Sequence, residues 1–597
     1  MNDPSVLLRS RLAERAARVA RLDRADAWVA HARLAVAIAA IATAVLVFGT
    51  HALTAGWLAL PAAAFVALVV VHDRVFHARA RARRAVAFHE AALERIAGRF
   101  AGHGTAGERF ADPAHPYAED LDLFGAGSLF ELLCAARTRA GEDRLAAWLR
   151  APADAAEVRA RQAAVQELAP RLDLREDLAV LGEAVRAAVE PARLAAWGEA
   201  PRLLPAFVVP AALALAAAAV ATAWAWGAGY GPVPFLAALL AGWAFGRALR
   251  GTIAGVLGGV GRPAAELRVL ALLLARLERE PFTGPRLLRL QEMLGAGSKD
   301  GGRASARIAR LERLASRVEW AHNQAFAPVA FALQWTPLHA ALVERWRAAH
   351  GGAVRGWLEA VADLEALSSL AGYAFEHPAD AFPEVLDPDA SPRARLDGDG
   401  LRHPLLAAAV ANDVRLGGDA PAVLLVSGSN MSGKSTYLRT VGVNVVLALA
   451  GAPVRAARLR LTPVQLGATL RIQDSLQAGK SRFYAEITRL KQLMDLAGGR
   501  FPLLFLLDEI LHGTNSHDRR IGAEAVVRGL VARGALGLVT THDLALTELA
   551  GQDGALGNAH FEDQVQGGEI AFDYRLRPGV VGHSNALALM RAVGLKV

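Results

Sequence analysis

The chain has 597 residues, enough for about three or four domains, and its single cysteine excludes an internal disulfide and fits a reducing compartment. Its net charge of +8 and its pI near 10.0 are carried almost entirely by arginine. These values suit an anionic partner, either nucleic acid or lipid headgroups, and they do not choose between the two.

Two pairs of uncharged apolar runs interrupt the chain, at residues 34–49 and 53–71 and at residues 203–226 and 233–246. Each run approaches the ~20 residues that a helix needs to cross a bilayer. Arginines flank both pairs on both sides, which indicates that the ends of each hairpin face the cytoplasm. We therefore expect two transmembrane helical hairpins, lipid as a partner, and a cytoplasmic (inner) membrane protein whose soluble domains face the cytoplasm. The alternative is two alanine-rich helix pairs buried in a soluble core.

The order of apolar, helical and proline-rich stretches predicts six parts. They are a basic N-terminal segment with the first hairpin (1–85), a linker (86–119), a helical core (120–200), the second hairpin (201–250), further helices (251–378) and an α/β domain (379–597). The arginines at 9–24 read as a positive flank of the first hairpin, with a nucleic-acid arm as the alternative.

A family resemblance first appears in the helical core. Residues 123–130, Thr138 to Gly141 and Trp148 to Pro152 resemble the core domain of the MutS family, and residues 363–371 resemble the helix that returns from its levers. The resemblance implies that 120–200 is a helical hub and that 251–378 holds lever helices.

The next motif is a glycine-rich loop between an expected strand (423–426) and an expected helix ending near Leu449. This is the arrangement of a phosphate-binding P-loop, in which backbone N–H groups and a helix N-terminus surround phosphate oxygens. Lys434 is expected to reach the β- and γ-phosphates of ATP, and Ser435 to bind Mg²⁺. The expected ATP-binding residues of this loop are Gly428, Ser429, Asn430, Met431, Ser432, Gly433, Lys434, Ser435 and Thr436.

An apolar strand that ends in Asp508 and Glu509 follows in the same domain. A strand-end carboxylate pair is typical of a Walker B element, in which Asp508 holds Mg²⁺ and Glu509 positions the attacking water. We expect Lys434, Glu509 and His542 to be the catalytic residues. His542 is included because it ends the strand after Walker B and resembles the family's switch histidine. A surface histidine is the alternative for His542.

Two further positions complete the expected site. Ser481 opens a helix that extends to about Leu496, and it resembles the family's signature loop, which serves the γ-phosphate of the opposite subunit. The resemblance thus implies a homodimer with composite ATP sites; helix capping by Ser481 is the simpler alternative. Tyr574 is expected near the adenine, with core packing as the alternative.

The sequence therefore predicts an ABC-type P-loop ATPase domain of α/β class at the C-terminus, an all-α core and lever domain, and two transmembrane hairpins. The resemblance implies a dimeric, MutS-like ATP hydrolase that moves helical levers at the membrane. The resemblance and the basic charge favour double-stranded DNA as the client. Residues 1–115, however, hold a membrane hairpin where mismatch-reading members of the family carry an α/β domain with a Phe-x-Glu wedge, and this argues against mismatch reading. The alternatives are a membrane-anchored ATPase or scaffold that does not act on DNA, and a protein like an ABC transporter.

Overall fold

The computed structural model describes residues 3–186, 191–258, 264–295, 302–387, 393–471, 482–511, 515–542, 544–551, 554–566 and 569–580. The chain divides into two compact units. The first contains residues 1–97, 172–279 and 297–355, and the second contains residues 98–171, 280–296 and 356–597. The six-part division expected from the sequence stays a prediction. Within 86–119, however, helix continues to Ile96, and residues from Gly98 onward belong to the second unit.

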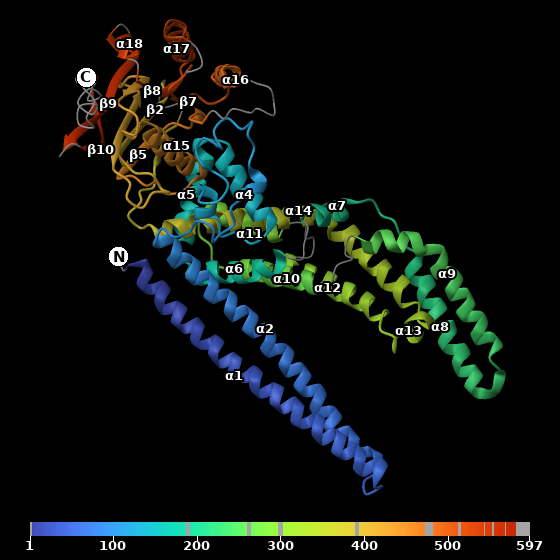
Figure 1. Cartoon of the computed structure of the whole chain (residues 1–597). Helices are drawn as coiled ribbons and strands as arrows, with labels where there is room; N and C mark the ends of the chain where they lie inside the picture. The colour runs from blue at the N-terminus through green and yellow to red at the C-terminus, as the bar shows by residue number, and fades with distance from the viewer. Residues whose placement is uncertain are drawn as a thin grey trace. The chain divides into compact units, whose positions relative to one another are not determined.

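The first unit is helical. α1 (Pro4–Ala44) and α2 (Ala59–Ile96) lie side by side as a hairpin, as Figure 1 shows in blue. The other helices of this unit are α6 (Leu172–Arg186), α7 (Pro191–Glu199), α8 (Val208–Ala225), α9 (Val233–Gly258), α10 (Ala264–Glu278), α12 (Ala304–Trp320), α13 (Ala327–Ala332) and the first half of α14 (Trp335–Glu376).

Four helical segments are long and apolar enough to cross a membrane by length and composition: Pro4–Gly49, Ala55–Ile96, Val208–Tyr230 and Val233–Gly258. They contain the expected runs 34–49 and 233–246 in full and most of the runs 53–71 and 203–226, which begin a few residues before the helical segments. The helices extend beyond those runs because arginine-rich and alanine-rich flanks also favour helix. Little of their most apolar stretches is buried in the structure, so most of these apolar side chains are exposed.

In the second unit, short helices precede two sheets. The helices are α3 (Leu129–Leu133), α4 (Arg139–Arg150), α5 (Ala155–Leu168), α11 (Pro285–Gly295) and the second half of α14. A four-stranded sheet has the order β1-β5-β2-β3, with β1 (Glu384–Val385), β2 (Arg395–Leu401), β3 (Asn412–Gly417) and β5 (Arg458–Leu461).

The larger sheet has six strands in the order β10-β9-β4-β8-β7-β6. They are β4 (Val423–Ser427), β6 (Gln465–Thr469), β7 (Leu503–Asp508), β8 (Leu536–Thr541), β9 (Leu556–Gln566) and β10 (Glu569–Pro578). All neighbours pair in parallel except β10, which is antiparallel to β9. The carboxyl ends of β4, β7 and β8 consequently meet at one edge of the sheet.

Helices cover this sheet and fix its core. α15 (Lys434–Ala450) is buried along almost its whole length, and a Cβ at its Gly442 would lie 2.7 Å from both Leu121 and Leu506. A helix that approaches a strand and a loop so closely needs glycine at that point. α16 (Arg482–Leu496), α17 (Ser516–Val531) and α18 (Leu544–Thr547) contribute leucine, valine and alanine to a core shared with β4, β7 and β8.

Candidate functional site

The glycine-rich loop joins the buried strand β4 to α15, as the sequence predicted. Its backbone uses conformations that L-residues rarely adopt, with φ of 148° at Gly428, 68° at Met431 and 103° at Gly433. A Cβ at Gly428 would lie 3.0 Å from a backbone oxygen of Phe561, and one at Gly433 would lie 3.1 Å from the ring of Tyr574. Both glycines are therefore required by backbone conformation and by close neighbours.

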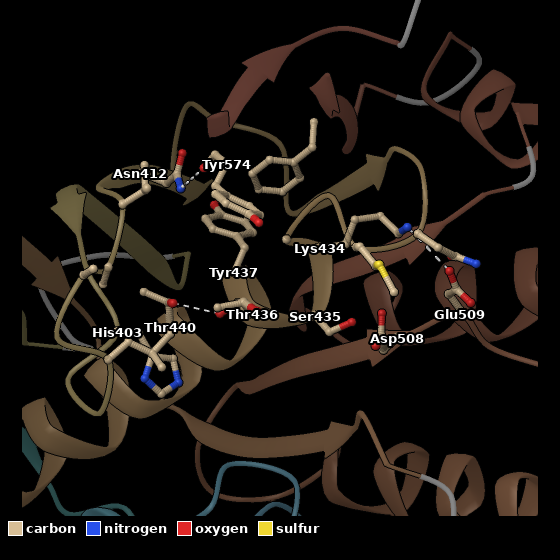
Figure 2. A pocket seen from close by; sticks show the side chains of 18 residues that line it. His403, Asn412, Lys434, Ser435, Thr436, Tyr437, Thr440, Asp508, Glu509 and Tyr574 are labelled. Carbon is tan, nitrogen blue, oxygen red and sulfur yellow. Dashed lines mark hydrogen bonds and ion pairs between the residues drawn. The ribbon is translucent and has the colours of Figure 1, made fainter. Parts of the chain in front are cut away.

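Lys434 opens α15 and is almost fully buried. Its Nζ donates hydrogen bonds to the carbonyl oxygens of Gly428 and Ser429, each at 2.9 Å, and lies 3.5 Å from Oε1 of Glu509 (Figure 2). An ammonium group held inside a loop whose backbone curves around it can bind an anion at the same place.

The two carboxylates leave the end of β7 in different directions. The Thr540 hydroxyl on β8 donates to Oδ1 of Asp508 and accepts from the backbone N–H of Glu509 at 3.0 Å. Glu509 has a φ of +49°, an uncommon value for a residue with a side chain. Its Oε1 lies 3.6 Å from Nδ1 of His542, so the glutamate stands between a lysine and a histidine.

Lys434, Asp508 and Glu509 line one pocket of about 540 Å³, whereas Thr540 and His542 are not among its lining residues. Of the residues expected from the sequence, the pocket is lined by Asn430, Met431, Gly433, Lys434, Ser435, Thr436, Asp508, Glu509 and Tyr574. Gly428, Ser429 and Ser432 belong to the same loop without lining the pocket, and the buried hydroxyls of both serines have no hydrogen-bond partner among the described residues. Ser481 lies outside the described residues, so its expected role stays a prediction.

Tyr574 reaches the pocket through a contact that the sequence did not reveal. The side-chain nitrogen of Asn412 donates to the backbone oxygen of Tyr574 at 2.9 Å, and its oxygen accepts from the N–H of Leu576 at 2.7 Å. Tyr574 itself has a φ of +55° and a half-exposed ring. Asn412 therefore fixes an unusual turn that presents this ring, and since the two residues are 162 positions apart, no local pattern could have indicated it.

Two other lining residues were also missed. Tyr437 is buried beside the loop and donates its hydroxyl proton to the backbone oxygen of Asp413 at 2.8 Å. Burial, aided by the nearby Arg439, lowers the pKa of His403 to about 4. His403 is therefore neutral at pH 7, and its Nδ1 accepts from the N–H of Leu405. The sequence signal that could have indicated Tyr437 is its spacing, one turn after Lys434.

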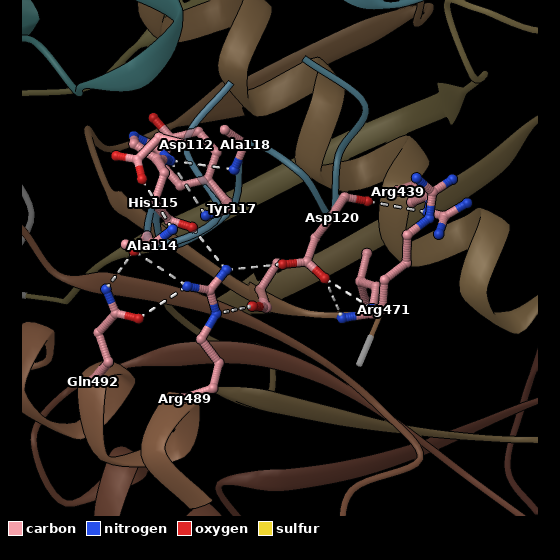
Figure 3. A network of polar contacts seen from close by, with 12 residues as sticks. Asp112, Ala114, His115, Tyr117, Ala118, Asp120, Arg439, Arg471, Arg489 and Gln492 are labelled. Carbon is pink, nitrogen blue, oxygen red and sulfur yellow. Dashed lines mark hydrogen bonds and ion pairs between the residues drawn. The ribbon is translucent and has the colours of Figure 1, made fainter. Parts of the chain in front are cut away.

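A polar network joins the region around Asp120 to the elements of the site (Figure 3). Oδ1 of the buried Asp120 accepts from the N–H groups of Leu470 and Arg471, and its Oδ2 accepts from Arg489 on α16 at 3.1 Å. The backbone oxygen of Asp120 accepts from Arg439 on α15. One carboxylate thus holds both the chain after β6 and the helix α16.

Comparison with known proteins places this site in a family. The family model described as MutS domain V matches residues 424–596. The chain is 34% identical over 252 residues to the DNA mismatch repair protein MSH3 of Phaeosphaeria nodorum, covering 40% of this chain and 21% of that protein. It is 32% identical over 242 residues to the DNA mismatch repair protein MutS of Natronomonas pharaonis, covering 40% of this chain and 27% of that protein.

The matched region contains β4 apart from its first residue, the glycine-rich loop, α15, Asp508, Glu509 and His542. The matched part of the chain spans 21% and 27% of the length of these two relatives. Residues 424–596 of the chain thus form a domain of the MutS domain V family.

Proposed function

We propose that the chain is an ATP hydrolase whose site is the pocket lined by the glycine-rich loop, the start of α15 and the end of β7. One observation carries the proposal: three features meet at this pocket. They are a glycine-rich loop with a left-handed backbone at several residues, the buried ammonium group of Lys434, and the Glu509 carboxylate 3.5 Å from that ammonium group. The match of residues 424–596 to MutS domain V supports the same activity.

Different groups of the chain bind the phosphates and the adenine of ATP. The N–H groups of the loop and of the first turn of α15 face phosphate oxygens, and Lys434 exchanges its bonds to the carbonyl oxygens of Gly428 and Ser429 for bonds to the β- and γ-phosphates. The Tyr574 ring lines the same pocket and offers a face for the adenine.

The donors also fit Mg²⁺. The Ser435 hydroxyl and the Asp508 carboxylate line one pocket, a hard-oxygen set of the kind that binds this ion together with phosphate and water. When bound, Mg²⁺ supplies positive charge against the β- and γ-phosphate oxygens.

Hydrolysis requires a positioned water. Glu509 orients a water toward the γ-phosphorus and accepts its proton, the new oxygen–phosphorus bond forms, and the bond from the γ-phosphorus to the bridging oxygen breaks to give ADP and phosphate. We also propose that His542 contacts the γ-phosphate; its Nδ1 lies 3.6 Å from Oε1 of Glu509, which supports this role.

The proposed ATPase works as a homodimer, because the resemblance of Ser481 to the family's signature serine implies that one subunit completes the site of the other. ATP binding then closes the dimer, hydrolysis reopens it, and the helices of 251–378 move as levers. The four apolar helical segments anchor the proposed ATPase in the inner membrane, with its soluble parts in the cytoplasm. The exposed apolar side chains of these segments and their arginine flanks support this location.

A second proposal concerns the client. The two relatives are named as DNA mismatch repair proteins, and the chain carries a net charge of +8, so we propose double-stranded DNA contacted through its phosphates. Stimulation of ATP turnover by duplex DNA, falling as salt rises, is the expected result. Equal turnover with and without matched, mismatched or branched DNA would favour a membrane ATPase that does not act on DNA.

The primary test measures ATP binding and turnover by the detergent-solubilised chain and by Lys434→Ala. The variant is expected to lose both, because its loop keeps no cation for the phosphates. A variant that binds ATP with unchanged affinity would refute the site. Extraction of vesicle-bound chain with alkaline carbonate tests the membrane anchor separately, and an inserted protein is expected to stay with the lipid.

A further inference from the structure

A second pocket lies in the first unit, between the last helix of the second hairpin and a short apolar helix. Its volume is about 400 Å³, and α9 and α13 form its walls (Figure 1 shows the two helices). Arg247 and Arg250 line it from α9, and Ala327, Ala330 and Phe331 line it from α13. The segment that supplies α13 is about eighty residues further along the chain, so sequence inspection alone could not place these groups together.

The two arginines are suited to bind an anion. They are three residues apart on one helix and therefore lie on one side of it. Both are exposed, and among the described residues neither has a hydrogen bond or an ion pair. No aspartate or glutamate is among the residues that line the pocket. The charge of the two guanidinium groups is thus unneutralised, and their planar N–H forks match the oxygens of a phosphate.

Aromatic side chains lie in and near the pocket formed by α9 and α13. Trp243, one turn before Arg247, and Phe331 on α13 both line the pocket with half-exposed rings. Trp320, at the end of α12, stacks on Trp335 with ring centroids 6.4 Å apart and is also exposed. Tryptophan and arginine together are typical of the level at which a membrane protein meets lipid headgroups.

The two walls of the pocket meet at Gly242 of α9 and Gln334, which follows α13. A Cβ at Gly242 would lie 2.4 Å from the side-chain nitrogen of Gln334, which is buried and donates to the backbone oxygen of Phe331. Gly242 thus allows α9 to approach the end of α13, and both residues line the pocket. The position of Arg247 directly after the apolar run 233–246 places the pocket where that run ends.

From these observations we infer that the pocket between α9 and α13 binds the phosphate group of an anionic phospholipid. Arg247 and Arg250 hold the phosphate oxygens, while Trp243 and Phe331 contact the glycerol and the upper acyl chains. Apolar walls beside the cations select a lipid over a soluble phosphate. The inference relies on the proposed membrane insertion of α8 and α9.

The test titrates the full-length chain in a non-ionic detergent with phosphatidylglycerol or phosphatidylcholine and counts the lipids bound per chain by native mass spectrometry. The wild type is expected to retain phosphatidylglycerol preferentially. The double variant R247Q/R250Q is expected to lose this preference by about tenfold or more, because both phosphate-binding forks are gone. R247K/R250K keeps the charge without the forks and is expected to lie between the two.

The matched control is R279Q/R345Q, which removes the same charge from two exposed arginines of the same unit that do not line the pocket. Its lipid binding is expected to equal that of the wild type. Equal binding by R247Q/R250Q, or equal losses in both double variants, would overturn the inference. Displacement of phosphatidylglycerol by inorganic phosphate as effectively as by lipid would also overturn it.

Alkaline carbonate extraction separates this result from the membrane proposal. A chain that stays in the membrane but shows no preference for phosphatidylglycerol refutes the lipid site alone. A chain that carbonate releases refutes membrane insertion, and the lipid site with it.

Discussion

Replacing Thr540 by valine tests how the carboxylates of the proposed ATPase site are positioned. The hydroxyl of this buried residue donates to Asp508 and accepts from the N–H of Glu509, and valine keeps the shape while removing both bonds. Losing a hydrogen bond to a carboxylate and leaving a buried N–H without an acceptor each cost about 1–3 kcal/mol. We expect Thr540→Val to destabilise the domain by about 3 kcal/mol.

Thr540→Val should lower kcat by more than the loss of folded protein alone would explain. The N–H bond fixes the backbone of Glu509 in its uncommon left-handed conformation, so its loss lets the carboxylate turn away from the water. A positioned base contributes about 10²–10⁴-fold, and partial misplacement should lower kcat by about 10–100-fold. KM for ATP should change little, because Lys434 and its loop are untouched.

Thr469→Val supplies the matched control. Thr469 ends β6 opposite Leu507 of β7, and its buried hydroxyl has no partner among the described residues. The same chemical change should therefore alter stability by less than about 1 kcal/mol and leave kcat unchanged. Steady-state ATP turnover and thermal denaturation of both variants decide the matter. If Thr540→Val turned over ATP as fast as Thr469→Val, the bridging role of Thr540 would be wrong.

Two further predictions concern the second unit away from the pocket. Asp120→Asn weakens a largely buried ion pair with Arg489, which keeps backbone acceptors at Ala114 and His115, so thermal denaturation should show a loss of about 2 kcal/mol. Asp122→Asn, at a half-exposed pair, should cost under about 1 kcal/mol, and equal losses in both variants would contradict the role of Asp120. Burial raises the pKa of Glu365 from 4.5 to about 7. The folded state thus holds its proton more tightly than the unfolded state, and stability should fall as pH rises from about 4.5 to about 7, by on the order of 3 kcal/mol. Glu365→Gln should remove this slope from the thermal midpoint measured against pH, and an unchanged slope would show that another group titrates.

The site could be predicted from the sequence where its parts are local. The strand before Gly428, the helix that begins at Lys434 and the strand that ends in Asp508 were all predicted, because strand, loop and carboxylate pair each occupy a few consecutive residues. Parallel pairing then brings Asp508 opposite Thr540. For the fold class, the sequence predicted helical domains followed by a C-terminal domain that contains a sheet.

Contacts between distant segments could not be predicted. Asp120 meets Leu470 and Arg471 across about 350 positions, and Asn412 meets Tyr574 across 162. Such contacts follow from packing, and no periodicity along the chain signals them. The pocket formed by α9 and α13 belongs to the same class, because its cations and its apolar wall come from separate parts of the sequence.

Glu509→Gln gives the most direct test of the proposed ATPase. The change keeps the size of the side chain and removes the proton acceptor, while leaving Lys434 and its loop in place. The variant should bind about one ATP per chain, retain it unhydrolysed in a single-turnover assay, and run as a closed dimer in a mass measurement. Hydrolysis by Glu509→Gln at the rate of the wild type would contradict the account.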